Sequence, residues 1–208
     1  MTPRQKLLLA TWTGVFLWSG IHPRDRFTWF LEVLPAILGL AAVLVTHRRF
    51  PLTPLAQLLI CIHCAILMIG GKYTYAEMPL FNWLRDSFGL ARNYYDRLGH
   101  FFQGFGPAII TREVLLRHRV VQSRGWLAFL TVCVCMAFSA AWEFFEWWVA
   151  LASGESATAF LGTQGDPWDT QWDMFMCTIG ATLSVALLSR IHDRELRAQF
   201  PQLLQTQP

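Results

Sequence analysis

Acidic residues and one histidine recur at helical spacing along this chain. Three pairs are three or four residues apart: Asp96 with His100, Glu143 with Glu146, and Asp169 with Asp173. Residues at this spacing share one face of a helix. Carboxylates combined with an imidazole are ligands that suit Zn, Mn or Fe. The pattern predicts that these six residues are metal ligands.

A bound divalent metal can activate water or polarise a substrate oxygen. Glu143, Glu146, Asp173 and His100 are the predicted catalytic residues, because a proton donor or acceptor is needed beside the metal. Without a metal, two of these carboxylates can still act as acid and base if their environments differ.

Helix capping offers an alternative for part of this set. "NYYD" and "DPWD" have the pattern of helix starts, with Asn93 or Asp166 as the N-cap. In each case the next aspartate, Asp96 or Asp169, falls at the third helical position, where an acid favours the helix dipole. Capping and ligation are equally good interpretations of these two residues.

His100 and Asp173 lie one turn deeper in their helices, where capping no longer explains a polar side chain. Glu143 and Glu146 fall near a helix C-terminus, where an acid opposes the dipole. These four residues therefore require another partner, and a shared site is the prediction.

The elements that position these residues are apolar. The chain has 208 residues, of which 54% are hydrophobic and 15% charged, whereas soluble domains have about 25% charged residues. A span needs roughly 20 apolar residues. We expect an all-α polytopic membrane helix bundle, with residues 1–208 as one integral-membrane domain. Its six transmembrane helices are expected near 7–21, 27–46, 55–71, 94–114, 126–152 and 168–189.

Basic residues set the expected orientation. Eleven Lys and Arg residues flank the helix ends on the N-terminal side and six lie on the opposite side. By the positive-inside rule both termini are cytoplasmic, in a multi-pass protein of the bacterial inner (plasma) membrane. No basic face is large enough to predict a nucleic-acid partner.

In this topology the polar pairs share one depth, near the outer boundary of the membrane. Glu32 lies at the same depth on a fourth helix. Ionisable side chains are costly in lipid, so they should face the bundle interior. Six acids exceed the neighbouring cations Arg92, Arg97 and Lys72, so protons or a bound cation must reduce the charge.

Other residues at this depth are predicted to bind substrate. Lys72, Tyr73 and Tyr75 in "GGKYTYAEMP" offer hydroxyls and a charge to a lipid headgroup, and Arg97 belongs to the same group. Gln103 lies one turn below His100 and can hydrogen-bond to it or to the ligand. The alternative for the tyrosines is an interfacial aromatic belt.

Three further segments receive structural interpretations. "CIHC" at 61–64 is mid-helix, so its cysteines are expected to be buried side chains rather than a redox or metal motif. Gly99, Gly106 and Pro107 are expected to allow close helix approach and a kink. "TREVLLRHRVVQSR" at 111–124 is interpreted as a basic surface that sets topology.

Four long blocks carry a family resemblance: "GGKYTYAEMP", "RNYYDRLGHFFQGFGPAIITREVLLR", "EFFEWW" and "FLGTQGDPWDTQWDM". Together they resemble the YjdF-type family of bacterial inner-membrane proteins over nearly the whole chain. The resemblance implies a multi-spanning membrane protein and carries no activity. The order acid-x-x-x-His, acid, Asp also resembles, more weakly, VanZ-like membrane proteins associated with glycopeptide-antibiotic resistance.

The sequence therefore favours cation-dependent chemistry on, or recognition of, an envelope lipid or lipid-linked molecule, by a metal-dependent membrane hydrolase or transferase. A cation- or proton-coupled transporter is the first alternative. A structural or assembly subunit, in which the acids pair with arginines, is the second. Substrate, metal identity and oligomeric state stay open.

Overall fold

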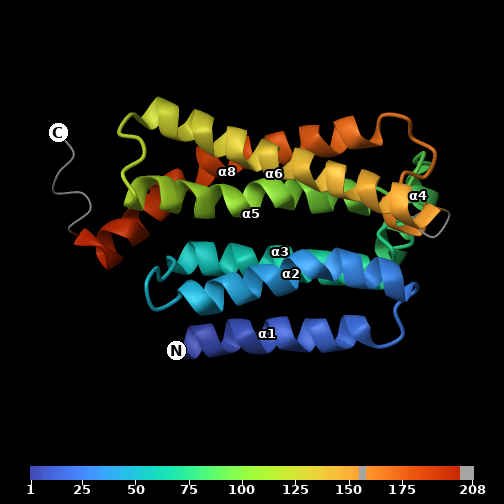
Figure 1. The fold of residues 1–208 in the computed structure, drawn as a ribbon, viewed down its shortest axis with the longest axis horizontal. Helices are drawn as coiled ribbons and strands as arrows, with labels where there is room; N and C mark the ends of the chain where they lie inside the picture. Colours follow the sequence, from blue (N-terminus) through green and yellow to red (C-terminus); the bar gives the residue numbers. More distant parts are fainter. Residues whose placement is uncertain (155–157, 202–208) are drawn as a thin grey trace.

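The computed structural model describes residues 1–154 and 158–201. Within these ranges the chain forms helices and no strand, which confirms the all-α expectation (Figure 1). The helices are α1 (Pro3–Gly20), α2 (Arg26–Thr46), α3 (Pro54–Lys72), α4 (Pro79–Phe88), α5 (Tyr95–Arg117), α6 (Arg124–Ser153), α7 (Thr158–Leu161) and α8 (Asp169–Gln199).

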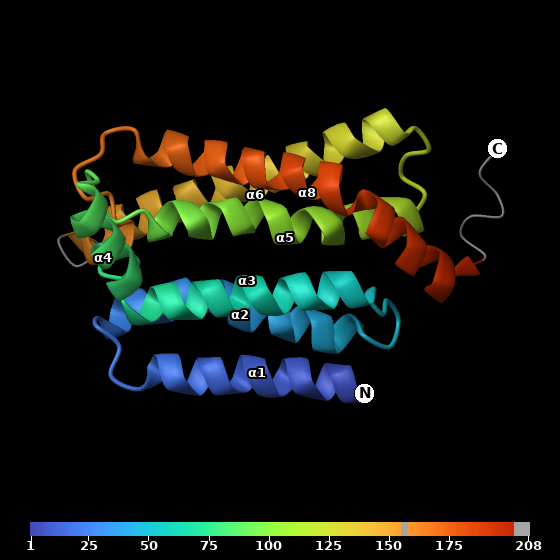
Figure 2. The same ribbon diagram turned by 180° about the vertical axis from the view of Figure 1, so that it is seen from behind.

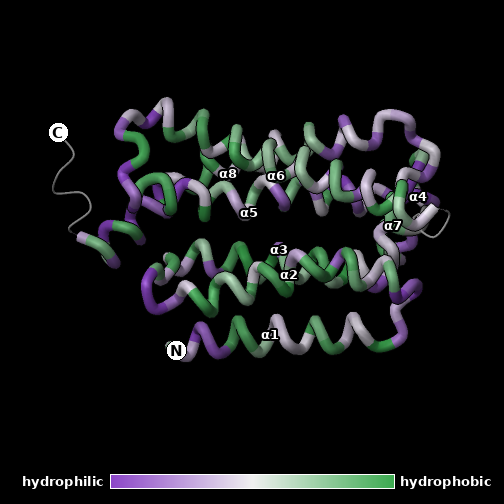
Figure 3. Tube along the Cα trace, in the orientation of Figure 1, coloured by the Kyte–Doolittle hydropathy of each residue, from purple (hydrophilic) through white to green (hydrophobic). Residues whose placement is uncertain are grey.

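The long helices form two groups. One contains α1, α2 and α3, the other contains α5, α6 and α8, and α3 packs against α5 to join them (Figures 1 and 2). We call the end that contains α4, with the connecting segments 21–25, 73–94 and 162–168, the α4 end. The opposite end, with turns 47–53 and 118–123, is the N-terminal end. Hydrophilic residues gather at these two ends (Figure 3).

Within the described residues, four helices are long and apolar enough, by length and composition, to cross a membrane: α2, α3, α6 and α8. The other two long helices run beside them, and α5 is more polar for a structural reason. It lies between α3, α6 and α8, so its buried Arg97, His100, Arg112 and Glu113 face protein rather than lipid.

Local capping signals explain the starts of α1, α2 and α3. Thr2 forms a capping box with Gln5, and Asp25 accepts a hydrogen bond from the amide of Thr28 at 2.7 Å. Thr53 caps α3 and is followed by Pro54 at the first helical position.

The expected caps of α5 and α8 are each displaced by one or two residues. Asn93 Oδ1 accepts from the amide of Tyr95 at 3.1 Å, and Asp166 Oδ1 accepts from the amide of Trp168 at 2.9 Å. Each helix begins only after this turn, and no side chain caps either helix. The predicted N-cap and third-position assignments are therefore wrong, but Asp96 and Asp169 do lie in the first turns of their helices, where an acid favours the helix dipole.

Two helical segments extend beyond the sequence expectation. The short helix α4 was not predicted; it ends at Gly89 in the left-handed conformation (φ 63°) and exposes Leu80 and Trp83. Helix α8 continues to Gln199 rather than residue 189. Its added turns are useful because Glu195 accepts a hydrogen bond from the amide of Leu55, in the first turn of α3, at 2.7 Å.

The cysteine and glycine expectations have different outcomes. All five cysteines are free, and Cys61 and Cys64 are buried in α3, as expected of packed side chains. Gly99 does lie close to the Tyr75 ring. However, the closest backbone approach is at Gly104 and Gly180, which the sequence interpretation did not single out.

These two glycines bring α5 and α8 into backbone contact. A Cβ on Gly104 would collide with the carbonyl oxygen of Cys177, and a Cβ on Gly180 would collide with that of Phe101. The two helices run parallel, since Asp96 lies near Asp169 at one end and Arg112 contacts His192 at the other. Small residues are what allow such a close crossing in a membrane protein.

We expect Gly104→Ala to destabilise the protein by about 1–3 kcal/mol or more, because backbone rather than a flexible side chain occupies the space of the new methyl group. The matched control is Gly39→Ala in α2, where nothing lies within 4 Å of an added Cβ. That change should be neutral or gain up to ~1 kcal/mol from helix propensity. Thermal unfolding in detergent measures both, and equal midpoints would contradict the close approach.

Candidate metal centre

Three helices bring the predicted ligands together at the α4 end. Asp96 and His100 come from α5, Glu143 and Glu146 from α6, and Asp173 from α8. Asp96, His100 and Asp173 offer ligand atoms within 4.8 Å of one another, and so do His100, Glu143 and Glu146. The predicted convergence is therefore present for these five residues, and His100 belongs to both groups.

His100 Nε2 is the centre of the arrangement. It lies 3.6 Å from Asp96 Oδ1, 3.8 Å from Glu143 Oε1 and 4.0 Å from Asp173 Oδ2. Ligands bound at about 2.0–2.2 Å from a zinc ion lie roughly 3–4 Å from each other. The distances from His100 Nε2 to each acid fall in this range, and the acids divide into two sets that share His100: Asp96 with Asp173, and Glu143 with Glu146.

Gln103 sets the orientation of the His100 ring. Its Oε1 lies 3.1 Å from His100 Nδ1, so Nδ1 carries the proton and donates it to this amide oxygen. The lone pair of Nε2 then faces the carboxylates. A ligating histidine is normally held in this way by a hydrogen bond on its other ring nitrogen. Gln103, predicted as a ligand-binding residue, thus lies directly behind His100.

Two buried carboxylate oxygens in the cluster have no hydrogen-bond partner. These are Glu143 Oε1 and Asp173 Oδ1, and the side chains of both residues are more than nine-tenths buried. Buried polar atoms are almost always satisfied in folded proteins. Glu143 Oε1 lies 3.8 Å from His100 Nε2, and Asp173 Oδ1 lies 3.8 Å from Arg97 Nε, so each has a nitrogen nearby but beyond hydrogen-bond distance.

Arg92 and Arg97 neutralise the neighbouring acids rather than the whole cluster. Arg92 pairs with Asp169, and its guanidinium also donates to the carbonyl oxygen of Gly162 at 3.1 Å. Arg97 pairs with Asp166 at 2.6 Å. Asp169, a predicted ligand, is therefore engaged by arginine.

The arginines reach the ligand cluster only at its edge. Arg92 Nη2 is 3.8 Å from Asp96 Oδ2, and Arg97 Nε is 3.8 Å from Asp173 Oδ1. Both distances are too long for a hydrogen bond. Among the described residues, Glu143 and Glu146 have no Lys or Arg partner within ion-pair distance.

Two charged groups outside the helices, Arg92 and Asp166, have pKa values consistent with this pairing. Burial lowers the pKa of Arg92, but its hydrogen bond to Asp169 and the surrounding carboxylates more than offset this, so the pKa is raised overall. The pKa of Asp166 lies below its usual range, mainly because the amide of Trp168 donates to it and also because Arg97 pairs with it. Both groups remain charged at neutral pH.

The other predicted substrate residues divide into two groups. Tyr75 is buried, and burial raises the pKa of its hydroxyl well above the usual range, with the charges of Glu32, Tyr95 and Asp96 adding to the effect. Tyr75 and Glu32 therefore extend the site toward α2 and α3. Arg97 lies over the ring of Trp172, 5.0 Å from its centroid, and belongs to the arginine–aspartate pairs beside the cluster.

Lys72 and Tyr73 do not join the cluster. Lys72 Nζ donates to the carbonyl oxygens of Trp18 at 3.2 Å and Ile21 at 2.5 Å, at the end of α1. Tyr73 packs edge-on against Trp18, with centroids 6.3 Å apart. These contacts fasten the α1–α2 turn, so Lys72 does not contribute to the charge balance of the site.

Sequence reasoning missed a second polar cluster at the N-terminal end. Glu113 is fully buried and accepts hydrogen bonds from Thr53 Oγ1 at 2.7 Å, Arg117 Nη1 at 2.9 Å and His192 Nε2 at 3.2 Å. Arg112 donates to His192 Nδ1 at 2.9 Å and to Asp193. Segment 111–124 is thus not only a basic surface, as had been expected.

This N-terminal cluster is satisfied within the protein. Arginine can only donate, so His192 Nδ1 must accept and Nε2 must donate to Glu113, which makes the ring neutral. No carboxylate oxygen of Glu113 is among the buried atoms without partners. A complete network of this kind holds α3, α5 and α8 together, and it contrasts with the incomplete cluster at the α4 end.

Comparison with known proteins places the chain in a family. The family described as "Predicted membrane protein (DUF2238)" matches residues 4–194. The chain belongs to this family. It is also 50% identical over 187 residues to "Inner membrane protein YjdF" of Escherichia coli (strain K12), covering 90% of each chain. No solved structure matches.

Membership in the DUF2238 family establishes the coarse class. The chain is a membrane protein with transmembrane helices, and the predicted YjdF-type resemblance is confirmed. The family description and the relative's name specify neither a substrate nor a metal. The cluster around His100 is therefore the feature from which a function must be argued.

Proposed function

We propose that this protein binds a divalent cation, Zn, Mn or Fe, at the α4 end and uses it in chemistry on a lipid or lipid-linked molecule. Asp96, His100, Glu143, Glu146 and Asp173 are the proposed ligands. The proposal rests on one observation: His100 Nε2 faces three carboxylates at 3.6–4.0 Å, while two of the buried oxygens lack any partner.

The chemistry proposed is that of a metal-dependent hydrolase or transferase. A bound cation would neutralise the unpaired carboxylates and lower the pKa of a bound water. Glu143 and Glu146 come from the same helix face, so one can ligate while the other accepts a proton. In this proposal Asp169 is not a ligand: it pairs with Arg92 and positions the start of α8.

The depth of the cluster supports an amphiphilic substrate. Exposed aromatic side chains surround the α4 end; they include Trp83, Trp147, Trp148, Trp168 and Trp172. Tryptophan concentrates where lipid headgroups meet the hydrocarbon. A ligand at this level would present a polar headgroup to the cluster and an apolar part to the bilayer.

The membrane topology is part of the proposal. We infer six spanning helices, α1, α2, α3, α5, α6 and α8, with both termini in the cytoplasm. Support comes from the side-by-side arrangement of these helices, whose axes are nearly aligned (Figure 1), and from the excess of basic residues at the N-terminal end. The name of the E. coli relative supports placement in the bacterial inner membrane.

The first test is the metal content of the purified protein in detergent. We expect near-stoichiometric Zn, Mn or Fe in the wild type and its loss in the double variant His100→Ala, Asp173→Asn. Glu77→Gln is the matched control, because Glu77 is an exposed acid at the same end that pairs with Arg24. Elemental analysis after reconstitution with each cation gives the result. An unloaded wild type, or equal loading of the double variant, would refute the metal centre.

One observation favours a proton- or cation-coupled transporter as a second candidate. Ser139 and Thr131 on α6 and Ser184 on α8 are fully buried with unpartnered hydroxyls, at heights between the two polar clusters. Against it, Cys135, Cys177, Ala108 and Ala181 form an apolar cluster at the same level. Ion flux in proteoliposomes that depends on Asp173 would reverse the ranking.

The arginine pairing limits the third interpretation, a purely structural role. Asp166 and Asp169 fit it well, because Arg92 and Arg97 engage them directly. Glu143 and Glu146 do not fit it, since no Lys or Arg of the described residues lies within ion-pair distance of either carboxylate.

A further inference from the structure

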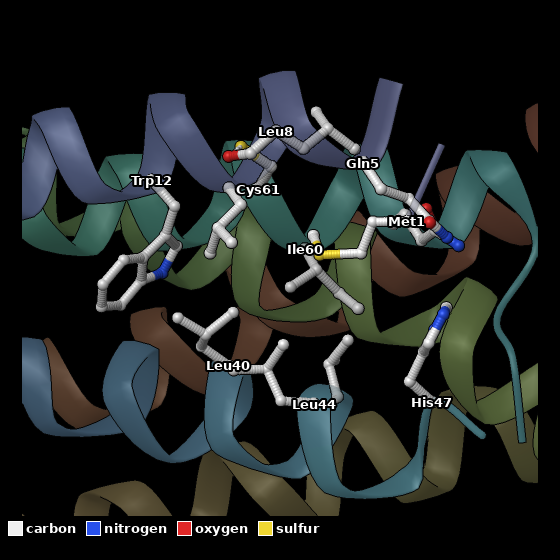
Figure 4. A pocket seen from close by; sticks show the side chains of 12 residues that line it. Met1, Gln5, Leu8, Trp12, Leu40, Leu44, His47, Ile60 and Cys61 are labelled. Carbon is white, nitrogen blue, oxygen red and sulfur yellow. Dashed lines mark hydrogen bonds between the residues drawn. The ribbon is translucent and has the colours of Figure 1, made fainter. Parts of the chain in front are cut away.

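A groove opens between α1 and α2 toward the N-terminal end, away from the metal centre. At the α4 end these helices are in contact: Trp29 Nε1 donates to Ser19 Oγ at 3.1 Å, and its ring lies 5.8 Å from that of Phe16. Farther along, α1 and α2 each pack on α3 and leave a space between them (Figure 4).

The length of the groove is apolar. Its walls are Leu8, Leu9 and Trp12 from α1 and Leu40, Val43 and Leu44 from α2, over Ile60 and Cys61 of α3. The cavity measures ≈ 100 Å³, whereas a single water needs about 10–15 Å³ and several polar partners. A space of this size and lining suits a hydrocarbon chain and does not suit water.

Polar residues line only one end of the groove. Gln5, His47 and Gln57 lie there, beside Met1, at the level where the α2–α3 turn leaves the bundle (Figure 4). Trp12 closes the opposite, deep end. The groove therefore matches the polarity of a lipid: its length is apolar, and its end near the α2–α3 turn is polar.

The mouth is also cationic. Arg4 and Lys6 flank Gln5 in the chain and Arg48 follows His47; all three are exposed and form no ion pair within residues 1–154 and 158–201, and Arg4 Nη2 donates to the carbonyl oxygen of Pro54 at 2.6 Å. Segments 1–24 and 47–72, which make up α1, the α2–α3 turn and α3, contain no Asp or Glu at all. This charge is complementary to a phosphate at the headgroup level.

We propose that the groove binds one acyl chain of an anionic phospholipid, with its phosphate at the mouth beside Arg4 and Arg48. The occupant is a lipid of the leaflet at the N-terminal end. This site is distinct from the metal centre, which lies at the other end of the bundle on α5, α6 and α8. Its presence does not depend on the proposed chemistry there.

The test uses the full-length protein in nanodiscs of phosphatidylcholine that contain a trace of phosphatidylglycerol with a photoactivatable group in its acyl chain. After illumination, mass spectrometry maps the labelled residues. We expect labels to concentrate on Leu8–Trp12 and Leu40–Leu44. Photoactivatable phosphatidylcholine should label the same residues several-fold less.

Two variants with matched controls make the result specific. Leu44→Trp fills the groove and should reduce labelling several-fold, whereas Val45→Trp, at an adjacent side chain that is 81% exposed, should leave it unchanged. Arg48→Gln with Arg49→Gln should abolish the preference for phosphatidylglycerol. Arg190→Gln with Arg194→Gln, exposed at the same end on α8, should preserve it.

The proposal is overturned if Leu44→Trp and Val45→Trp label equally, or if labels spread evenly over the lipid-facing surface. Protein–protein crosslinks from these residues would overturn it in favour of a second copy of this chain. If Leu44→Trp lowers the yield of folded protein, the charge variants decide alone, because their side chains lie at the surface. Equal labelling by the two lipids would then exclude an anionic ligand.

Discussion

Glu143→Gln is expected to weaken divalent-cation binding by more than ~100-fold and, at the same time, to stabilise the metal-free protein by about 1 kcal/mol. The opposite signs follow from the structure. Glu143 Oε1 is a buried acceptor without a partner, and it lies near Glu146 and His100. A neutral amide removes the repulsion between carboxylates and can donate to one of them.

The measurement pairs cation titration with thermal unfolding after chelation, at a pH where free carboxylic acids are ionised. Asp193→Asn is the control, because Asp193 pairs with Arg112 at 2.6 Å in the N-terminal cluster. It should lower stability and leave cation affinity unchanged. A Glu143→Gln protein that is destabilised with unchanged cation affinity would show that Glu143 has a structural role only.

Arg92→Gln is expected to destabilise the protein by about 3–5 kcal/mol, the usual cost of removing one partner of a buried ion pair. Arg92 is 5% exposed, pairs with Asp169 and lies 3.6 Å from Asp166 and 3.8 Å from Asp96. Its removal leaves Asp166 and Asp169 with Arg97 alone and leaves Asp96 without an arginine partner among the described residues. The turn at Gly162 also loses its hydrogen bond.

Arg85→Gln provides the matched control for this change. Arg85 pairs with Asp86 on the surface of α4, where such pairs contribute little, so no change in the unfolding midpoint is expected. Thermal unfolding of both variants in detergent is the readout. Divalent cations should partly rescue Arg92→Gln if they bind the neighbouring cluster, since a bound cation replaces some of the lost charge. Equal stability of the two variants would contradict the central position of Arg92.

The apolar runs of the sequence were sufficient to predict the long helices, because their period and length depend only on local composition. The predicted range 27–46 differs from α2 by one residue at its start, and 55–71 differs from α3 by one residue at each end. The sequence did not predict the short helix α4, because ten residues of mixed composition form no long apolar run. The extension of α8 to Gln199 depends on Glu195 reaching the start of α3, which is a tertiary contact.

The site shows the same division. Helical spacing and an expected common depth grouped Asp96, His100, Glu143, Glu146 and Asp173, because an ionisable side chain inside a membrane must face other protein. The structure places these five residues in two groups that share His100, and their role as metal ligands stays a prediction. Spacing alone could not separate these from Asp169, which pairs with Arg92. It also could not show that Lys72 turns away toward α1, since a long side chain can reach either direction from a helix end.

The sequence by itself determined the class of this protein, an all-helical membrane protein of the DUF2238 family, and the helical spacing of its polar residues. Only the tertiary structure decided which of those residues meet. The backbone contact at Gly104 and Gly180 sets the distance between α5 and α8, and Gln103 sets the ring of His100. Both depend on how helices pack against each other, and that geometry is a property of the whole bundle rather than of any segment.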